Sequence, residues 1–376
     1  MMKSSISALL FLVGCVSLIG AQQVALFPIE KNGKTGYIDV SGRVIIKPQF
    51  DDGWPFNEGV APVRVGDDWG YIDATGKIVI KPQFFQAKKF SNGIASVGVW
   101  FPQKQVITSK VGFYNYIDRK GQLISKDQFE VAFSFADGLA QVLTWDYKNG
   151  IIDTNGTLKF YFDIYNAGFS NGLAMFKTNG NMPDTKVGYI DKSGKIAIPP
   201  TFDYGEDFSE GLACVSSGNG SGFVDSNGKI AIELKFDGCG RFYEGLASVL
   251  VNGLVGFIDK TGKMVIPPQF AWNPGKESRF SDGVAVVKIG ESEKPTKDGL
   301  RNVTITPDRN IMANSSGLYG VIDKTGKFVM PPKYVQLGDF ENGLAWVNLS
   351  DAYIIHGDTN RWGYINKQGK IVWKSF

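Results

Sequence analysis

The sequence is poor in histidine and cysteine, and this argues against the commonest metal and nucleophile sites. It contains one histidine, His356, and three cysteines in 376 residues. Zinc sites draw mainly on His and Cys at paired spacings, which Cys214 and Cys239 lack. A Cys/His nucleophile arrangement and a Gly-x-Ser-x-Gly elbow are also missing. We therefore expect no cofactor and no metal.

The chain also lacks an excess of charge of one sign. It has 40 Lys and Arg against 37 Asp and Glu, a formal net charge of +3. Proteins that bind nucleic acid gather Lys and Arg on one face in order to release counterions. No such cluster stands out in the sequence, so we expect no nucleic-acid partner.

Long apolar runs are confined to the N-terminus. Lys3 is followed by an apolar stretch from Ile6 to Ile19 and by small residues ending at Ala21, which is typical of a secretory signal peptide. We predict a signal peptide over residues 1–21 and an exported protein, which is periplasmic, secreted or at the cell surface. Leu12 to Cys15 also resembles a bacterial lipobox, in which Cys15 would carry a lipid anchor. No later stretch is long enough for a transmembrane helix in the mature chain.

Cys214 and Cys239 would be the only cysteines left after cleavage at Ala21. Export permits a disulfide between them. Cys239, however, stands in a column that other copies of the repeat described below fill with small residues, namely Gly53, Ala87, Ala132 and Gly205. We favour the interpretation that it is a small buried side chain and leave the disulfide open.

One short pattern recurs nine times along the chain. An aromatic or aliphatic residue is followed by Ile or Val, by Asp, by two polar residues and by Gly, and a short apolar run comes next. The Asp side chain can accept hydrogen bonds from turn amides and Gly supplies a positive φ, so the pattern predicts a hairpin. In five copies we expect the second strand to stop at a proline: Pro48, Pro82, Pro199, Pro267 and Pro331. The turn residues are Asp39, Asp73, Asp118, Asp153, Asp191, Asp225, Asp259, Asp323 and, in the ninth copy, Asn366.

A second pattern, Phe-x-x-Gly-aliphatic-Ala, occurs eight times and opens a third short strand. It begins at Phe56, Phe90, Phe135, Phe169, Phe208, Phe242, Phe280 and Phe340. Between the two patterns lies an aromatic column at Phe50, Phe84, Phe129, Phe202, Phe236, Phe270 and Tyr334. Rings at fixed spacing in nearly every copy predict core positions, because each removes a large apolar area from water.

The spacing of the two patterns separates a fixed half of the unit from a variable half. From the turn Asp to the next Phe-x-x-Gly glycine the distance is 20 residues in six copies, and 19 and 24 in two others. From that glycine to the next turn Asp it ranges from 14 residues to 40. Insertions therefore collect in one connection, and we expect them on one side of the molecule. The longest lies at about residues 291–314 of a single repeat array over residues 22–376.

These patterns predict an all-β fold made of nine three-stranded meanders. A single meander is too small to cover its own apolar side, so consecutive units must stack on one another. Closed propellers usually contain four to eight four-stranded blades. We therefore prefer an open, twisted solenoid and keep a propeller-like ring as the second architecture.

The segment from Asp68 to Phe84, with the sequence DWGYIDATGKIVIKPQF, closely resembles the bacterial WG-repeat family, also called KWG repeats. The resemblance extends over essentially the whole mature chain. It implies a β-rich repeat protein that is commonly exported and has interaction roles without an established common chemistry. The chain departs from the family by keeping the Trp of the Trp-Gly pair only at Trp69 and Trp362, which argues against this Trp as a repeated ligand contact.

The candidate binding residues are aromatic and histidine side chains in or beside the insertions: Trp100, Phe101, Tyr353 and His356. Exposed aromatic residues on loops can anchor a partner. We expect a non-enzymatic interaction scaffold whose partner is a protein or a cell-envelope polymer.

A carbohydrate or cell-wall binding module is the second reading, and a polymer hydrolase is less favoured. Glycan binding predicts a row of exposed rings across successive units. Catalysis predicts one cleft with at least two acids of perturbed pKa, for which nothing in the sequence excludes Glu206, Asp207 or Glu210.

Overall fold

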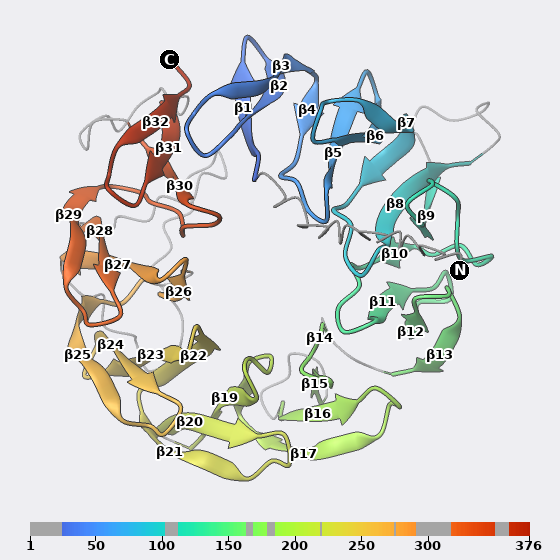
Figure 1. The fold of residues 1–376 in the computed structure, drawn as a ribbon. Coiled ribbons are helices and arrows are strands. Elements are labelled where there is room, and N and C mark those ends of the chain that lie inside the picture. Colours follow the sequence, from blue (N-terminus) through green and yellow to red (C-terminus); the bar gives the residue numbers. More distant parts are fainter. Residues whose placement is uncertain are drawn as a thin grey trace, which may run out of the picture.

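The described part of the chain folds into strands and their connections, without helices. The structure, a computed structural model, describes residues 25–101, 112–162, 168–178, 185–218, 220–273, 276–290, 317–349 and 361–376. In these ranges it contains 32 strands and no helix, which confirms the all-β repeat array. The strands form nine consecutive antiparallel units placed around a ring (Figure 1).

Each unit is a meander of up to four strands, of which the first faces the centre of the ring and the last lies on its outer rim (Figure 1). The first strands are β4 (Asp52–Gly53), β10 (Val131–Ala132), β14 (Phe169–Ser170), β18 (Tyr204–Gly205), β22 (Gly238–Tyr243) and β26 (Phe280–Ser281). The second strands are β1 (Phe27–Lys31), β5 (Val60–Val65), β8 (Ala95–Trp100), β11 (Leu139–Leu143), β15 (Leu173–Lys177), β19 (Leu212–Ser217), β23 (Leu246–Val251), β27 (Val284–Gly290) and β30 (Leu344–Asn348). The third strands are β2 (Lys34–Ile38), β6 (Asp68–Asp73), β9 (Gly112–Ile117), β12 (Asn149–Asp153), β16 (Val187–Asp191), β20 (Gly220–Asp225), β24 (Leu254–Asp259), β28 (Gly317–Asp323) and β31 (Trp362–Asn366). The outer strands are β3 (Val44–Phe50), β7 (Ile78–Ala87), β13 (Leu158–Tyr161), β17 (Ile196–Phe202), β21 (Ile230–Phe236), β25 (Met264–Ala271), β29 (Phe328–Tyr334) and β32 (Ile371–Lys374).

The short first strand is the element that the three-stranded prediction missed. Just after the aromatic column, the chain crosses into the next unit and pairs with that unit's second strand, as Asp52 does with Arg64 and Gly53 with Val63. In β7 the crossing is continuous, since Ala87 at its end pairs with Val97 of the next unit. Each crossing therefore ties neighbouring units together through backbone hydrogen bonds.

The Asp-x-x-Gly turns form as predicted. In unit 2, Oδ1 of Asp73 accepts hydrogen bonds from the backbone N–H of Thr75 at 2.9 Å and of Lys77 at 3.1 Å. Gly76 has a φ of +85°, a conformation that glycine adopts without a steric penalty. The other turns repeat the pair of side-chain bonds, with Asn366 replacing Asp in unit 9.

The outer strands do not stop at proline, and that expectation was wrong. Strand β3 passes through Pro48 and ends at Phe50. The pairing with β2 jumps from Tyr37↔Ile46 to Thr35↔Phe50, so the proline lies in a bulge where no ladder hydrogen bond is required of it. The strand is also the outer edge of its sheet, where proline is tolerated.

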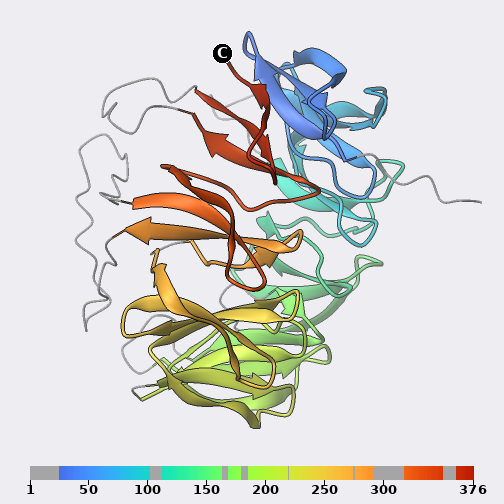
Figure 2. The ribbon, with the colours of Figure 1, turned by 60° about the vertical axis from the view of Figure 1, so that its left-hand side comes forward.

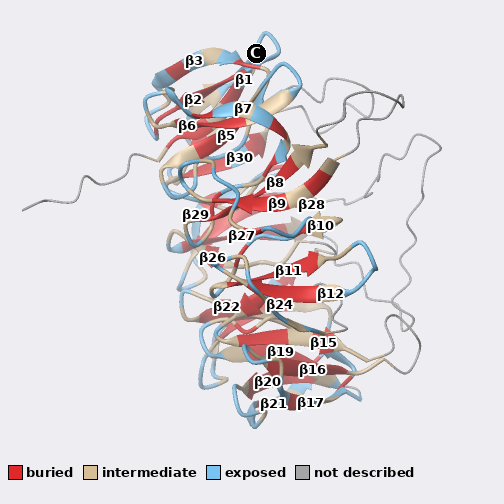
Figure 3. Cartoon of the chain, turned by 90° about the vertical axis from the view of Figure 1, so that its right-hand side faces the viewer, coloured by how far each residue is buried: buried red, intermediate tan, exposed pale blue. Residues whose placement is uncertain are grey.

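The apolar core lies between units, which confirms the stacking that the sequence predicted. One buried cluster joins Tyr37, Ile46 and Phe50 of unit 1 to Ala61 and other residues of unit 2. Figure 3 shows the same arrangement along the ring, with buried residues in the strands and exposed ones in the turns. Every member of the predicted aromatic column is buried.

The two ends of the strands define two faces of the ring. We call the face with the Asp-x-x-Gly and Phe-x-x-Gly turns the turn face, and the opposite face, where second strands lead into third strands, the insertion face. The flanks of the longer insertions end on the insertion face, for example Trp100 of β8 and Gly112 of β9. Residues 291–314 lie outside the described part of the chain.

A series of hydrogen bonds links neighbouring units along the turn face. The residue before each Phe-x-x-Gly glycine has a positive φ, and its side chain accepts the N–H of the equivalent glycine in the next unit. Glu58 accepts from Gly93 at 3.1 Å, and Asp137 accepts from Gly172 at 2.7 Å. The link recurs at Asn92–Gly138, Asn171–Gly211, Glu210–Gly245, Glu244–Gly283 and Asp282–Gly343.

The ring closes where unit 9 meets unit 1. Figures 1 and 2 show β30–β32 (red) beside β1–β3 (blue). The Tyr364 hydroxyl donates a hydrogen bond to the Pro28 carbonyl at 3.1 Å, and the rings of Phe27 and Tyr364 lie 5.4 Å apart. Leu344 of unit 9 shares a buried cluster with Phe27 and Ile29. Of the two architectures considered from the sequence, the structure thus adopts the propeller-like ring and not the preferred open solenoid.

Phe27 supplies a contact that comes from the Phe-x-x-Gly motif in other units. There the motif ring packs on the preceding unit, as Phe208 does on Tyr189 at 4.9 Å, and it faces the motif alanine, as Phe169 faces Ala174. Unit 1 has no such motif among the described residues. Phe27 occupies the alanine position, and its own ring fills the space against Tyr364. This substitution lets the ninth unit pack on the first.

Candidate binding site

Units 6 to 8 depart from the repeat at the centre of the ring. Strand β22 has six residues, whereas the other first strands have two. The segment between β25 and β26 belongs to the unit whose Asp-to-Gly spacing is 24 residues instead of 20. A local departure from an otherwise regular pattern is where a functional site is expected.

A cavity of about 710 Å³ lies at this place on the inner wall of the ring. We call it the inner-wall hollow. The first strands of units 6 and 7 and the segment around Trp272 and Glu277 line it, and Asp339 of unit 9 completes it. Two further cavities, of about 480 and 640 Å³, adjoin it through shared residues such as Asp339 and continue past Trp346 to unit 1. Together they form a concave surface that spans several units.

Arg241 of β22 is the centre of a charged network in the hollow. Its guanidinium lies 3.8 Å from Asp207 and 3.6 Å from Glu277, and its backbone N–H donates to the Glu277 carboxylate. Burial raises the pKa of both Asp207 and Glu277, and the nearby Arg241 charge only partly offsets this effect. The approach of Glu277 requires glycine at position 240, since an added Cβ would lie 2.2 Å from its Oε1.

A second network continues from the hollow into the adjoining cavity. Asp339 pairs with Arg279 at 2.9 Å and with Lys276 at 3.3 Å. Burial lowers the pKa of Lys276, while Asp339 acts in the opposite direction. Arg241 and Arg279 also both lie over the ring of Tyr243, at 5.5 and 5.2 Å. These contacts fix the cations in place before any ligand arrives.

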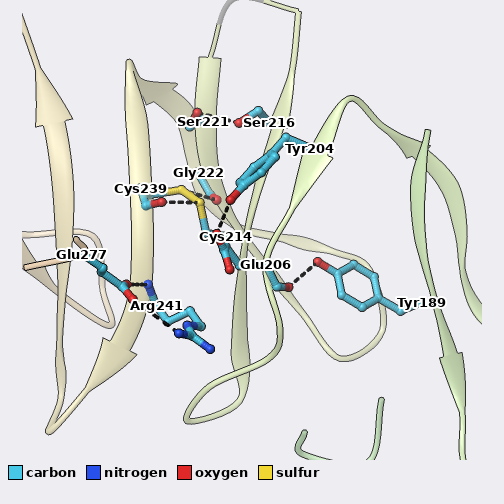
Figure 4. The surroundings of a disulfide bond; sticks show 10 residues. All are labelled: Tyr189, Tyr204, Glu206, Cys214, Ser216, Ser221, Gly222, Cys239, Arg241 and Glu277. Atoms are coloured by element: carbon cyan, nitrogen blue, oxygen red, sulfur yellow. Dashed lines mark hydrogen bonds and ion pairs between the residues drawn. A yellow bond between two sulfur atoms is a disulfide. The ribbon is translucent and has the colours of Figure 1, made fainter. Parts of the chain in front are cut away.

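Tyr204 and Glu206 of unit 6 also line the inner-wall hollow (Figure 4). The Tyr204 hydroxyl donates to the Glu206 carboxylate, and burial together with this bond raises the pKa of Tyr204. The ring remains 46% exposed, so it offers an accessible aromatic surface beside a carboxylate.

A disulfide joins units 6 and 7 at the edge of the hollow (Figure 4). It connects Cys214 of β19 to Cys239 of β22, with Cα atoms 5.8 Å apart. The preferred interpretation of Cys239 as an unbridged small residue was therefore wrong. The column does require small side chains: a Cβ on Gly205 would lie 2.7 Å from the Tyr189 hydroxyl. In unit 7 the same position also faces Cys214, which the sequence column could not reveal.

We expect reduction of this disulfide to lower the free energy of unfolding by about 3 kcal/mol, because a closed loop of this length restricts the unfolded chain. Urea titrations with and without dithiothreitol measure the effect. The C214A/C239A variant is the control and should not respond to the reductant. A wild-type midpoint that stays unchanged on reduction would contradict the bond.

The structure places two of the four predicted binding residues. Trp100 is half-buried at the end of β8; its Nε1 donates to Asp68 at 2.8 Å and its ring lies 5.0 Å from Phe85. Phe101 packs against Phe113 at 5.4 Å. Both lie on the insertion face, away from the inner-wall hollow. Tyr353 and His356 lie outside the described residues.

The three acids that the sequence left open have separate positions. Glu206 lines the hollow and Asp207 pairs with Arg241. Glu210 lies on the turn face, where it accepts the Gly245 N–H and pairs with Lys260 at 3.0 Å. Apart from Glu206, sequence reasoning missed the residues of the hollow, Arg241 among them, although the 24-residue spacing of unit 8 marked their place.

The acids with raised pKa at the hollow belong to one ion-pair network. Of the two acids whose pKa burial raises, only Glu277 lines the hollow, and both are held by one guanidinium. Glycoside hydrolysis needs two carboxyl groups facing each other across the substrate. Within the described ranges no group of His, Cys, Asp or Glu side chains could hold a metal ion.

A family model described as "WG containing repeat" matches residues 36–67, 69–99, 116–144, 150–181, 188–220, 222–254, 256–291 and 319–353. The chain belongs to this family. Each of the eight matches runs from the third strand of one unit to about the end of the second strand of the next, and together they confirm the resemblance noted in the sequence.

No curated protein matches this WG-repeat chain. Among solved structures, a eukaryotic initiation factor is similar in fold, with a TM-score of 0.59 and 11% identity over 94% of this chain and 96% of that one. BamB from Moraxella catarrhalis has a TM-score of 0.39 and 9% identity over 95% and 97% of the two chains. At these identities the likeness concerns the fold alone.

Proposed function

We propose that this WG-repeat protein is a non-enzymatic interaction scaffold that binds a protein partner on its inner wall. The observation that carries the proposal is the coincidence, in units 6 to 8, of an enlarged first strand, an inserted segment and the inner-wall hollow. The adjoining cavities extend the surface well beyond the span of a small ligand. A folded partner or an extended segment of one fits such a surface.

The charged residues of the hollow support binding in place of catalysis. Arg241, Lys276 and Arg279 are held by ion pairs and by the Tyr243 ring, so little side-chain entropy is lost when a partner docks. Preorganised arginines and aromatic rings are typical of residues that dominate protein interfaces.

We also propose that the protein is exported. The signal-peptide pattern of residues 1–21 motivates this proposal, and the Cys214–Cys239 disulfide supports it, because disulfides persist mainly in oxidising compartments. No helix within the described ranges combines the length and the apolar character needed to span a membrane.

A photo-crosslinking amino acid at Tyr204 tests the proposal in the native host. We expect a discrete protease-sensitive adduct from Tyr204, in the hollow, and none from the control position Tyr161, which is 52% exposed on outer strand β13. The adduct should disappear when Arg279→Glu reverses the charge in the second network. Equal adducts from both positions, or none from Tyr204, would contradict an inner-wall partner site.

A carbohydrate or cell-wall ligand is the second candidate, favoured by Trp346, which is 39% exposed and lines both adjoining cavities. It would give an adduct that resists protease and is cleaved by a glycan hydrolase. It would also make retention on cell-wall polymer depend on Trp346, so that Trp346→Ala abolishes retention.

A further inference from the structure

The outer rim carries a row of exposed aliphatic side chains that the sequence patterns assigned to no function. They lie two or three positions after the turn glycine in every unit but unit 4, at the start of the outer strand except for Leu123 of unit 3, and each is 36–54% exposed. They would normally be covered or charged at a sheet edge. The row, which we call the rim belt, comprises Val44, Ile45, Ile78, Val79, Leu123, Ile196, Ile230, Val265, Phe328, Val329 and Ile371.

Neighbouring units are in contact beside the rim belt, which is interrupted at unit 4, where Leu158 is half-buried. A Cβ added to Gly76 in the turn of unit 2 would lie 3.0 Å from Ile46 of unit 1, directly after the belt residues of that unit. The same close contact recurs between Gly262 and Ile232, at 3.0 Å. A Cβ on Gly42 would meet the Val372 carbonyl of unit 9, so the contact also crosses the closure. The exposed residues therefore follow the edge of the turn face around the ring.

A positively charged side chain lies at the start of the outer edge segment in seven of the nine units. The residue just after the turn glycine is an exposed Lys or Arg in seven units: Arg43, Lys77, Lys195, Lys229, Lys263, Lys327 and Lys370. The turn carboxylates accept backbone N–H groups of their own turns, as those of Asp191 and Asp259 do, and Asp39 also pairs with Arg43 at 3.1 Å. Lys and Arg also outnumber Asp across the nine turns. The Phe-x-x-Gly turns, nearer the centre of the ring, carry acids instead: Glu58, Asp137, Glu210, Glu244, Asp282 and Glu341. The net positive charge therefore lies at the outer edge of the turn face, beside the aliphatic side chains.

We propose that the turn face docks on an anionic lipid bilayer through the rim belt. Aliphatic side chains beside Lys and Arg match the boundary between acyl chains and anionic headgroups. A glycan surface would favour stacked aromatic rings, and Phe328 is the one ring in the belt. A closed ring presents these residues at one face, so that many weak contacts act together.

Docking in this orientation leaves the insertion face pointing away from the bilayer. The inference is independent of the proposed partner site, because the inner-wall hollow and the rim belt share no residue. Either could hold while the other fails.

Vesicle co-sedimentation tests the inference with a chain that begins at Gln22. This chain keeps every described residue and removes both the apolar leader and Cys15. We expect binding to vesicles that mix phosphatidylglycerol with phosphatidylcholine, little binding to phosphatidylcholine alone, and release at high salt because screening weakens the cation contacts. Millimolar inorganic phosphate should not compete, since the apolar contacts need a bilayer.

Two sets of variants in adjacent units separate the contributions. Removing three cations in K195Q/K229Q/K263Q should weaken binding about a hundredfold, since each cation near an anionic surface contributes about fivefold. Removing apolar contact in I196S/I230S/V265S should weaken it by more than tenfold. The control V65S/L318S changes aliphatic residues of similar exposure, 45% and 37%, at strand ends on the insertion face, and should bind like the wild type.

Circular dichroism must show the same fold for all variants. Equal binding to both kinds of vesicle, no binding to anionic vesicles, or wild-type binding by both rim-belt variants would each overturn the inference. A crosslink from Tyr204 under any of these outcomes would leave the proposed partner site intact.

Discussion

Replacing Phe27 with alanine is expected to lower the free energy of unfolding by about 3–5 kcal/mol, the range typical of a deleted buried ring. Phe27 is 9% exposed and its ring packs on Tyr364 across the closure. In other units the motif phenylalanine would still fill this space, but unit 1 has no such residue among those described. The variant should therefore leave a cavity at the one interface that joins the two ends of the array.

Urea unfolding and hydrogen exchange measure the consequence of Phe27→Ala. Amides of β1 and β31 should exchange faster than those of β20, which lies far from the closure (Figure 1). Phe376→Ala is the matched control, because Phe376 is 57% exposed and should change stability little. An unchanged unfolding midpoint for Phe27→Ala would mean that the ring does not depend on this contact.

The second large effect is expected at the glycine of the Trp-Gly pair. A Cβ on Gly70 would lie 2.5 Å from the Ile80 carbonyl and 2.7 Å from the Pro82 nitrogen. Both are backbone atoms of the bulge in β7, so neither can rotate away. Gly70→Ala should therefore displace the outer strand of unit 2 and cost about 3 kcal/mol, at the upper end of overpacking effects.

Unit 3 shows what a side chain at this position does. Asn115 stands where eight other units have glycine. Its side-chain amide donates to the backbone carbonyls of Ser125 and Asp127. The segment that follows forms only isolated β-bridges where the other units have an outer strand. The side chain has thus taken the space of the strand, as we expect for Gly70→Ala.

Thermal unfolding of Gly70→Ala tests this expectation. Gly168→Ala is the control, since a Cβ there meets no atom within 4 Å and the backbone has no positive φ. A Gly70→Ala protein as stable as the Gly168→Ala control would show that the bulge is not a steric requirement.

The sequence predicted the repeating half of the structure because local chemistry determines it. The Asp carboxylate and the turn glycine specify the hairpin within five residues, as at Asp73 and Gly76. The aromatic column follows from fixed spacing alone, and Phe236 is buried as expected. Such features repeat in each unit and do not depend on distant parts of the chain.

Ring closure could not be read from the repeat in the same way. The small rotation between neighbouring units decides whether nine units close into a ring or form an open array. The sequence of a single meander does not indicate the size of that rotation. The relevant signal was a single exception, Phe27 in a column of alanines, and its meaning depends on Tyr364 at the other end of the array.

An exception to the repeat also marked the candidate site in the sequence, but the sequence did not show which contacts the extra residues would make. The longer spacing of unit 8 indicated extra residues before Phe280, but not that Glu277 would reach Arg241 of unit 7. The Cys214–Cys239 disulfide was hidden for a similar reason. It joins units 6 and 7, which the repeat pattern alone does not distinguish from the other units.

The distance between units 1 and 9 tests the closed stack most directly. Spin labels on cysteines at Val40 and Ile371 would report the closure, and labels at Ala74 and Val44 occupy the equivalent positions of units 2 and 1. Cys214 and Cys239 are paired and would not be labelled, and a chain that begins at Gln22 lacks Cys15. A closed ring predicts the same short distance for both pairs. A long distance for Val40 and Ile371 beside a short one for Ala74 and Val44 would show an open array and contradict the fold described here.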